Sequence, residues 1–437
     1  MANIFLQQKA ENTLKRADDL IETGQKRVAF QELQSIIAGT RSTKNRQWSE
    51  TVEEVMMKFI ELCVDLRKGS EAKTAIMQFK SLCLPDHASS LDKALKYFVE
   101  QAEQRALTAQ TQSNSESLTL QKDLEDEIPE NILMSEVSGE DLKDRKDREI
   151  VTPWLKFLWE TYRIVLDILK MFPNKELQIR YHDTSQRAFK FCKDYKRKQE
   201  FRRLAEMLRI HLANIQKYAS QKDATHAKIN LNNAETIQNY LDTRFKQLDV
   251  ASDLELWNEA FKSIEDIHAL IRLSKKAVDP LLMIKFYEHL TKIFWVSENY
   301  LLHAYAYYKL FNLRIALKKE DNNLEHLSST LFLAALSIPS TSTEYDIMNI
   351  DFVEREKQQR MAFLLGLTVP PTKEQLLEEI IKKQVSKHVA SELSSLYHIL
   401  EVDFHPLDLC SKMSAVFKFL ETKPELSNYI RPLQKIT

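Results

Sequence analysis

The residues with the strongest potential to contact a ligand lie in one basic stretch, RAFKFCKDYKRKQEFRRLAEMLR, at positions 187–209. This stretch holds nine Lys and Arg residues against three Asp and Glu residues, a net charge of +6. Its basic residues recur at helical spacing, so that several of them would share one face. Such a face binds phosphates by releasing their condensed counterions. The candidate RNA-contact residues are therefore Lys190, Lys193, Arg197, Lys198, Arg202 and Arg203.

A second interpretation of the same stretch remains open. Phe189, Phe191, Tyr195 and Phe201 alternate with the basic residues, and they could fill the core of a solvated helical hairpin instead of stacking on bases. The lysines would then only offset acidic charge elsewhere in the chain. No RNA-binding sequence motif or zinc-finger spacing accompanies the stretch.

The 437 residues include only five glycines, and the two nearest to each other are Gly24 and Gly39. Phosphate-binding loops need clustered glycines so that backbone N–H groups can approach a phosphate closely. Rossmann and P-loop chemistry are therefore excluded for this sequence. Tight hairpin turns also depend on glycine, which argues against a fold rich in β-strands.

Histidine and cysteine do not form a recognisable site in the sequence. Eleven histidines are scattered without metal-ligand spacing, and no nucleophile elbow of the G-x-S-x-G type is present. His303 is expected to be a packed residue, and Asp183 after His182 to be a helix cap. Cys192 and Cys410 lie in apolar helical contexts and are expected to be ordinary buried thiols. We expect no catalytic residues, no metal and no cofactor, although a Ser-His-Asp group could assemble from distant positions.

The apolar spacing is helical almost throughout, which predicts an all-α chain. Gly24 and Gly69 separate pairs of apolar stripes, as turns between helices would. Ser252 with Glu255 and Thr372 with Gln375 have the spacing of a capping box. Small-large pairs recur at irregular intervals and are typical of closely packed helical hairpins: Ala29-Phe30, Ala75-Ile76, Ala188-Phe189, Ala260-Phe261 and Ala304-Tyr305. The pattern predicts a degenerate α-solenoid.

Charge and composition divide the chain further. Residues 113–150 carry a net charge of −7 and few large apolar side chains, so they are predicted to form an acidic linker that is partly disordered. The aromatic-rich segment beginning at Thr152 is predicted to be a central helix buried between its neighbours, with a partner groove as the alternative. The N-terminus lacks a signal-peptide core, and the longest uncharged run is too short and polar to span a bilayer. The four dispersed cysteines fit a reducing compartment, so a cytoplasmic protein is expected.

Several longer strings resemble one known family, the A subunits of eukaryotic translation initiation factor 3. They occur in collinear order and cover nearly the whole chain: ENTLKRADDLIETGQKRVAFQEL, MKFIELCVDLRKG, SGEDLKDRKDREIVTPWLKFLWETYR, AFKFCKDYKRKQEFRRL, LELWNEAFKSIEDIHAL, FWVSENYLLHAYAYYKLF, LAALSIP and LEVDFHPLDLC.

The resemblance implies a non-enzymatic scaffold built as a right-handed α-solenoid of irregular TPR/HEAT-like hairpins that leads into a PCI domain. Such a protein would bind the C subunit of the same factor through its PCI region. It would also bind proteins of the small ribosomal subunit, with electrostatic contacts to ribosomal RNA or mRNA. The alternative is a PCI-type scaffold of another assembly, the proteasome lid or the signalosome.

In the family a winged helix follows the string SNYIRPLQKIT, whereas this sequence stops at Thr437. We therefore expect only the helical part of the PCI domain here, with reduced or indirect contact to the C subunit. The expected domains are N-terminal hairpins at 1–112, the acidic linker at 113–150, central repeats at 151–314 and the start of the PCI domain at 315–437.

Overall fold

The structure is a computed structural model in which the described residues form helices and turns, and none of them lies in a strand. The all-α prediction is thus confirmed. The described residues are 2–39, 48–83, 87–122, 150–220, 229, 231, 233–274, 278–317, 324–339, 352–367, 372–383, 385, 389–402, 409–423 and 426–436. They fall into two compact units, Met1–Thr243 and Arg244–Thr437.

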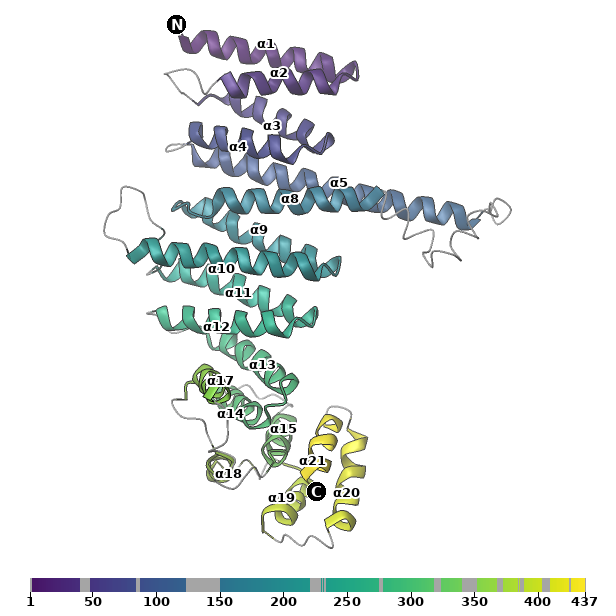
Figure 1. Cartoon of the computed structure of the whole chain (residues 1–437), viewed down its shortest axis with the longest axis vertical. Helices are drawn as coiled ribbons and strands as arrows, with labels where there is room; N and C mark the ends of the chain where they lie inside the picture. The colour runs from purple at the N-terminus through teal and green to yellow at the C-terminus, as the bar shows by residue number, and fades with distance from the viewer. Residues whose placement is uncertain are drawn as a thin grey trace. The chain divides into compact units, whose positions relative to one another are not determined.

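The first unit is a succession of antiparallel helices (Figure 1). Its helices are α1 (Ala2–Glu22), α2 (Lys26–Gly39), α3 (Glu50–Asp65), α4 (Gly69–Cys83), α5 (Ala88–Lys122), α8 (Thr152–Leu169), α9 (Lys175–Asp194), α10 (Lys198–Ser220) and the first half of α11 (Ala234–Asp253).

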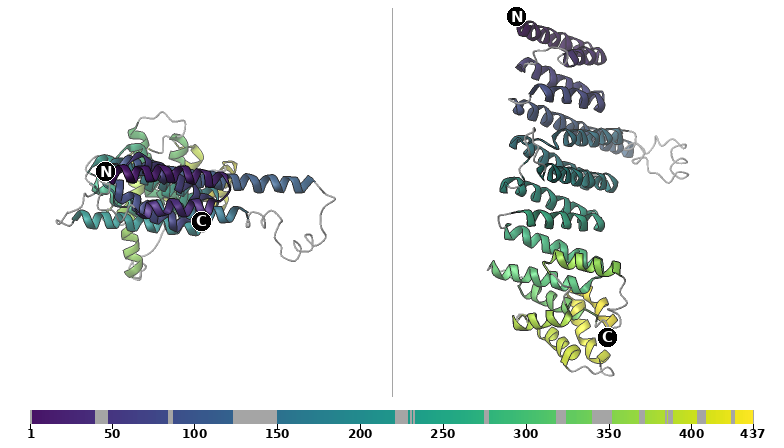
Figure 2. Two further views of the ribbon diagram at one scale, coloured as in Figure 1. Left: turned by 90° about the horizontal axis from the view of Figure 1, so that it is seen from above. Right: turned by 60° about the vertical axis from the view of Figure 1, so that its left-hand side comes forward.

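These helices make two rows. Helix α3 packs against α1 and α5, and α5 packs in turn against α9. On the other row, α4 packs against α2 and α8. Figure 2 shows the resulting stack of hairpins in the first unit. Each helix therefore buries one face against its own hairpin and another against the next, as expected for a solenoid of helical repeats.

The hairpin turns share one backbone motif. After α1, the N–H of Gln25 donates to the Leu20 carbonyl at 2.9 Å and that of Gly24 donates to the Ile21 carbonyl at 3.0 Å. Gly24 has a φ of 79°, so the turn is a Schellman motif with its left-handed residue at Gly24. The same pair of bonds closes five further turns, whose left-handed residues are Arg67, Lys196, Glu255, Glu298 and Gly366.

Gly69 does not form the turn between helices that the sequence predicted. The left-handed residue between α3 and α4 is Arg67, with a φ of 54°, and Gly69 is the first residue of α4. A Cβ atom at Gly69 would lie 2.7 Å from the carboxyl carbon of Glu160 in α8. A side chain at Gly69 would therefore have to displace the Glu160 carboxyl group, and only Gly24 of the two glycines supplies a left-handed turn.

Aromatic and small side chains fill the space between the helices of this unit. Phe30 of α2 stacks on Phe59 of α3, with ring centroids 5.0 Å apart, and Phe98 of α5 meets Phe157 of α8 edge-on at 6.2 Å. Helix α8 buries side chains on several sides, which confirms the prediction of a central buried helix.

A charged contact also joins two helices of this unit. Arg180 of α9 donates two hydrogen bonds to Asp92 of α5, of 2.7 and 2.9 Å.

The second unit contains the rest of α11 and a further series of helices. They are α12 (Trp257–Leu273), α13 (Pro280–Val296), α14 (Tyr300–Ala316), α15 (Leu324–Leu336), α17 (Phe352–Leu364), α18 (Lys373–Lys382), α19 (Ser391–Tyr397), the π-helical turn η3 (His398–Val402), α20 (Leu409–Thr422), the 3-10 turn η4 (Ser427–Tyr429) and α21 (Ile430–Ile436). Helix α14 packs between α13 and α15, and α15 meets α18 and α19.

One of the two predicted capping boxes is present. The Thr372 hydroxyl accepts from the Gln375 N–H, and the Gln375 side chain accepts from the Thr372 N–H, at the start of α18. The box predicted at Ser252 is wrong, because Ser252 lies in the last turn of α11 and α12 begins only at Trp257. Polar residues at capping spacing also occur in the turn of a helical hairpin. In this turn the Glu255 N–H donates to the Ser252 carbonyl as part of a Schellman motif, so it is not available to a capping side chain.

His303 is buried, as predicted, within a polar network of the second unit. Its Nδ1–H donates to the Thr291 carbonyl at 2.8 Å, and its Nε2 accepts from the Tyr429 hydroxyl at 2.9 Å. The Trp295 ring lies 5.1 Å from the imidazole and 5.0 Å from the Tyr429 ring. Burial lowers the pKa of His303 to about 4, so the ring is neutral at physiological pH.

The predicted linker falls mostly outside the described residues. Helix α5 continues to Lys122, past the expected boundary at 112, and the description resumes at Ile150. Among the described helices, none combines the length and apolar character that a membrane crossing requires.

Candidate nucleic-acid interface

The basic stretch folds as the end of α9, a tight turn and the start of α10. The Asn174 side chain accepts from the Glu176 N–H and caps α9. The helix stops after Asp194 because Lys196 turns left-handed, with the N–H of Arg197 donating to the Cys192 carbonyl at 2.8 Å. Helix α10 then returns antiparallel. A single continuous helical face across Lys193 and Arg197 is therefore not formed.

The aromatic residues of the stretch belong to the core. Phe189, Phe191 and Phe201 are at most 5% exposed, and the rings of Phe189 and Phe201 meet across the hairpin at 5.7 Å. Tyr195 is half-buried and donates from its hydroxyl to Gln110 of α5 at 3.0 Å. Burial thus excludes stacking of the three phenylalanine rings on bases. On this point the solvated-hairpin interpretation is correct.

The basic residues, by contrast, remain at the surface around the turn. Lys190 and Lys193 are exposed in the last turns of α9, and Lys198 and Arg202 in the first turns of α10. Since a helix rises 1.5 Å per residue, Lys190 and Arg202 each lie only about 6 Å along the axis from the helix end. Arg203 is exposed beside them and Arg197 is half-buried in the turn. The turn thus brings the six candidates to one end of one hairpin.

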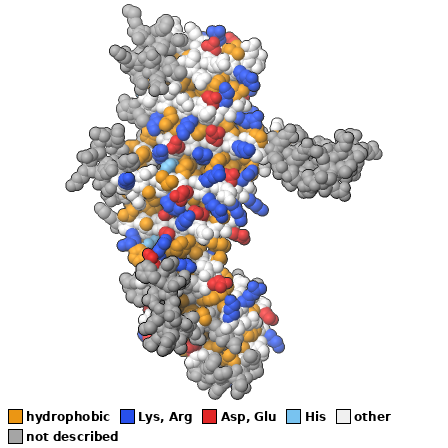
Figure 3. Space-filling model, in the orientation of Figure 1, with side chains coloured by type: hydrophobic (Ala, Val, Ile, Leu, Met, Phe, Trp, Pro, Cys, Tyr) orange, Lys and Arg blue, Asp and Glu red, His pale blue; other side chains and the backbone are white. Residues whose placement is uncertain are grey.

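Most of these cations have no carboxylate partner. Within the described part of the chain, no ion pair joins Lys190, Arg197, Lys198, Arg202 or Arg203 to an acidic side chain. Figure 3 shows Lys and Arg side chains gathered toward the right-hand edge at the level of α10. Unpaired surface cations pay little desolvation before they meet a phosphate, so they suit electrostatic binding.

Arg187, a basic residue of the same stretch, differs from these candidates because it forms ion pairs within the fold. Arg187 donates from Nε to Asp183 at 3.1 Å and from Nη1 to Glu103 of α5 at 3.2 Å. Asp183 lies inside α9, so its predicted role as a helix cap is wrong. His182, the other half of that pair, bonds through Nδ1 to the Thr243 hydroxyl at 2.8 Å.

Lys196 is an exposed cation that the residue-by-residue prediction left out. It is the left-handed residue of the turn, with a φ of 50°, and lies between Lys193 and Arg197 in the chain. Like the predicted Arg197, it lies between α9 and α10. The unbroken run Lys196–Arg197–Lys198 was the available signal.

A Ser-His-Asp group does assemble in the second unit, between α11 and α13. His289 Nε2 lies 2.8 Å from Asp249 Oδ1, and its Nδ1 lies 3.1 Å from the Ser252 hydroxyl. Burial tends to raise the pKa of Asp249, but the hydrogen bond and charge of His289 outweigh it and lower that pKa. The nearby backbone N–H groups of Glu255 and Leu256 are already bonded to the Ser252 and Ala251 carbonyls. These two N–H groups are therefore not free to form an oxyanion hole, and the three side chains join α11 to α13.

The described cysteines are buried, and the described acidic residues form no metal-binding group. Burial raises the pKa of the Cys83 and Cys192 thiols to about 12 and that of Cys63 further, so these thiols stay protonated. The side chain of Cys410 lies outside the described residues. In the described ranges, no three His, Cys, Asp or Glu side chains are grouped to hold a metal ion.

Comparison with known proteins agrees with this architecture. A family described as eIF3a, PCI domain, TPR-like region, matches residues 11–408. Curated relatives, each named as the A subunit of eukaryotic translation initiation factor 3, match 98% of the chain. Those of Coccidioides immitis and Aspergillus niger are 43% identical over 455 residues, and that of Aspergillus terreus is 42% identical. The chain spans 43%, 42% and 43% of the length of these three relatives.

Fold and matches together identify the kind of molecule. Stacked helical hairpins with Schellman turns, and a basic turn at the surface, define an all-α helical-repeat protein of the TPR-like type. Within that class, the chain belongs to the family of the A subunit of eukaryotic translation initiation factor 3, as the resemblance of its sequence predicted.

Proposed function

We propose that the chain is a non-catalytic scaffold segment of a cytoplasmic translation initiation factor 3 complex, and that its basic α9–α10 turn contacts the small ribosomal subunit through RNA. Membership of the A-subunit family supports the first part. It also favours this assembly over the proteasome lid or the signalosome. Other subunits of the factor, including its C subunit through the PCI region, and ribosomal proteins are the further partners in this proposal.

The observation that carries the RNA contact is the group of unpaired cations at one hairpin end. Lys190, Lys198 and Arg202 project from two helices whose geometry is fixed by the buried Phe189–Phe201 pair. A rigid cationic turn binds a phosphate backbone without reading base sequence. Several such modest contacts on one extended array would add up to a stable attachment.

The salt dependence of small-subunit binding tests this proposal. We expect alanine at all six candidate positions to weaken binding, because each phosphate contact accounts for about 0.7–0.9 in the slope of log K against log salt. Removal of two to four contacts would flatten the slope by roughly 1.5–3.5. The variant carries alanine at Lys190, Lys193, Arg197, Lys198, Arg202 and Arg203.

A charge-matched control separates the turn from net charge. Six other exposed basic residues of the first unit are replaced by alanine in the control: Lys15, Arg27, Lys96, Lys156, Arg163 and Lys175. The control should keep most of the salt slope. Equal slopes and affinities for the two variants would show that the turn makes no special contact.

A further inference from the structure

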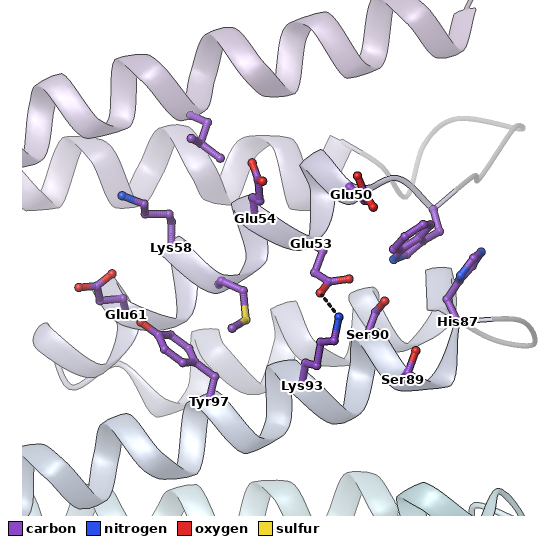
Figure 4. A pocket seen from close by; sticks show the side chains of 13 residues that line it. Glu50, Glu53, Glu54, Lys58, Glu61, His87, Ser89, Ser90, Lys93 and Tyr97 are labelled. Carbon is purple, nitrogen blue, oxygen red and sulfur yellow. Dashed lines mark hydrogen bonds and ion pairs between the residues drawn. The ribbon is translucent and has the colours of Figure 1, made fainter.

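A groove lies on the row formed by α1, α3 and α5, at a distance in sequence from the basic turn. It encloses about 530 Å³, within the range of ligand-binding clefts. Leu14 of α1 contributes to one wall, and Ser90 and Tyr97 of α5 to the other. Figure 4 shows side chains of α3 along its floor.

The two cations of the groove are already neutralised. Lys58 of α3 pairs with Asp18 of α1 at 2.6 Å. Lys93 of α5 pairs with Glu53 of α3 at 3.4 Å, as the dashed line in Figure 4 marks. These pairs bridge the helices across the groove. The net charge of the groove therefore comes from its remaining carboxylates.

Three carboxylates of α3 stay unpaired there. Glu50, Glu54 and Glu61 are exposed, and no ion pair joins them to a cation within the described part of the chain. Their spacing of four and seven residues places them along one face of α3. This face extends for about 16 Å, since a helix rises 1.5 Å per residue. The groove therefore offers three carboxylates in a row that form no ion pair among the described residues, with Lys58 between Glu54 and Glu61.

An unused hydrogen-bonding group lies in the same groove. Ser90, which lines the groove, is only 3% exposed. The Trp48 indole N–H is buried and lacks an acceptor among the residues that the structure describes. The Trp48 ring stacks on His87, with centroids 4.0 Å apart and planes 16° from parallel. Buried polar groups are normally paired, so the Trp48 N–H indicates a missing partner.

We propose that this groove binds a short arginine-containing basic segment of a partner protein in extended form. About five extended residues match the 16 Å row of carboxylates. Guanidinium groups would pair with Glu50, Glu54 and Glu61, and one would lie against the Trp48–His87 aromatic pair. The indole N–H would donate to a peptide carbonyl, and the Ser90 hydroxyl would bond to the peptide backbone.

Fluorescence anisotropy with labelled hexa-arginine and hexa-lysine peptides tests this proposal on the whole chain. We expect hexa-arginine to bind about threefold to tenfold more tightly than hexa-lysine, because arginine stacks on aromatic rings and forms bidentate pairs. Replacing Glu50, Glu54 and Glu61 together by Gln should weaken both peptides at least tenfold. Trp48→Leu should remove the preference for arginine while leaving lysine binding nearly unchanged.

The control variant carries Asp19→Asn, Glu176→Gln and Asp194→Asn, three exposed acidic residues of the same unit outside the groove. It should bind both peptides as the unaltered chain does. The proposal is overturned if the two triple variants behave alike, if arginine and lysine peptides bind equally, or if spermidine competes as well as hexa-arginine. The assay contains no ribosomes, so its outcome is independent of the function proposed for the basic turn.

Discussion

The buried imidazole of His303 links protonation to stability at the scale of one residue. Its folded pKa of about 4 lies below the ordinary value of 6.5, so in acid the unfolded chain binds a proton that the folded chain does not. The stabilising contribution is complete above pH 6.5 and is lost as the pH falls toward 4. We expect the free energy of unfolding to drop by up to about 1.4 kcal/mol per pH unit in this window. Urea unfolding at a series of pH values measures the slope.

The variant His303→Gln provides the control for that measurement. Glutamine keeps one donor and one acceptor but does not titrate. It should be less stable than the unaltered chain at pH 7, since it cannot satisfy both Thr291 and Tyr429 in the same geometry. Its unfolding free energy should depend less on pH between 6.5 and 4. An unchanged pH slope would assign the acid sensitivity to other groups.

The hairpin turns carry the main local constraint at the scale of the element. Gly24 and Glu298 occupy equivalent left-handed positions, with φ of 79° and 56°. We expect Gly24→Ala to cost about 1 kcal/mol, because open space surrounds Gly24 and only the backbone conformation resists a Cβ atom. Glu298→Gly should stabilise by about 0.5–1 kcal/mol, since it relieves that strain at the expense of unfolded-state entropy. Thermal unfolding measures both changes.

Glu298→Ala is the matched control, because alanine removes the charge and keeps the Cβ atom in the left-handed region. It should show none of the gain expected for glycine. A gain equal to that of Glu298→Gly would assign the effect to the missing carboxylate and not to the backbone.

Elements were predictable where local spacing decides their structure. The capping box at Thr372 depends on residues three positions apart, and it forms as predicted. The boundary at Ser252 was not predictable in the same way, since the Schellman turn depends on backbone conformation at Glu255, a residue without the usual glycine signal. For the same reason, spacing alone assigned the turn after α3 to Gly69 and not to Arg67.

At the scale of the whole molecule, the helical period of the apolar residues was sufficient to predict an all-α repeat protein. The basic turn was partly predictable, because its cations cluster within 187–209, but the burial of Phe189 and Phe201 required the packing of α9 on α10. The acidic groove could not be found from sequence. Its residues come from Leu14, the 48–61 region and the 87–97 region, which only the stacking of α1, α3 and α5 brings together.

The chain is proposed to work as a scaffold segment of the initiation factor on the small ribosomal subunit. Affinity purification of the chain from a cell extract, followed by mass spectrometry, tests this role most directly. We expect recovery of other initiation factor 3 subunits together with small-subunit ribosomal proteins, and a smaller ribosomal yield from the six-alanine variant than from its charge-matched control. Recovery of proteasome-lid or signalosome subunits, or of neither initiation factor nor ribosomal proteins, would contradict it.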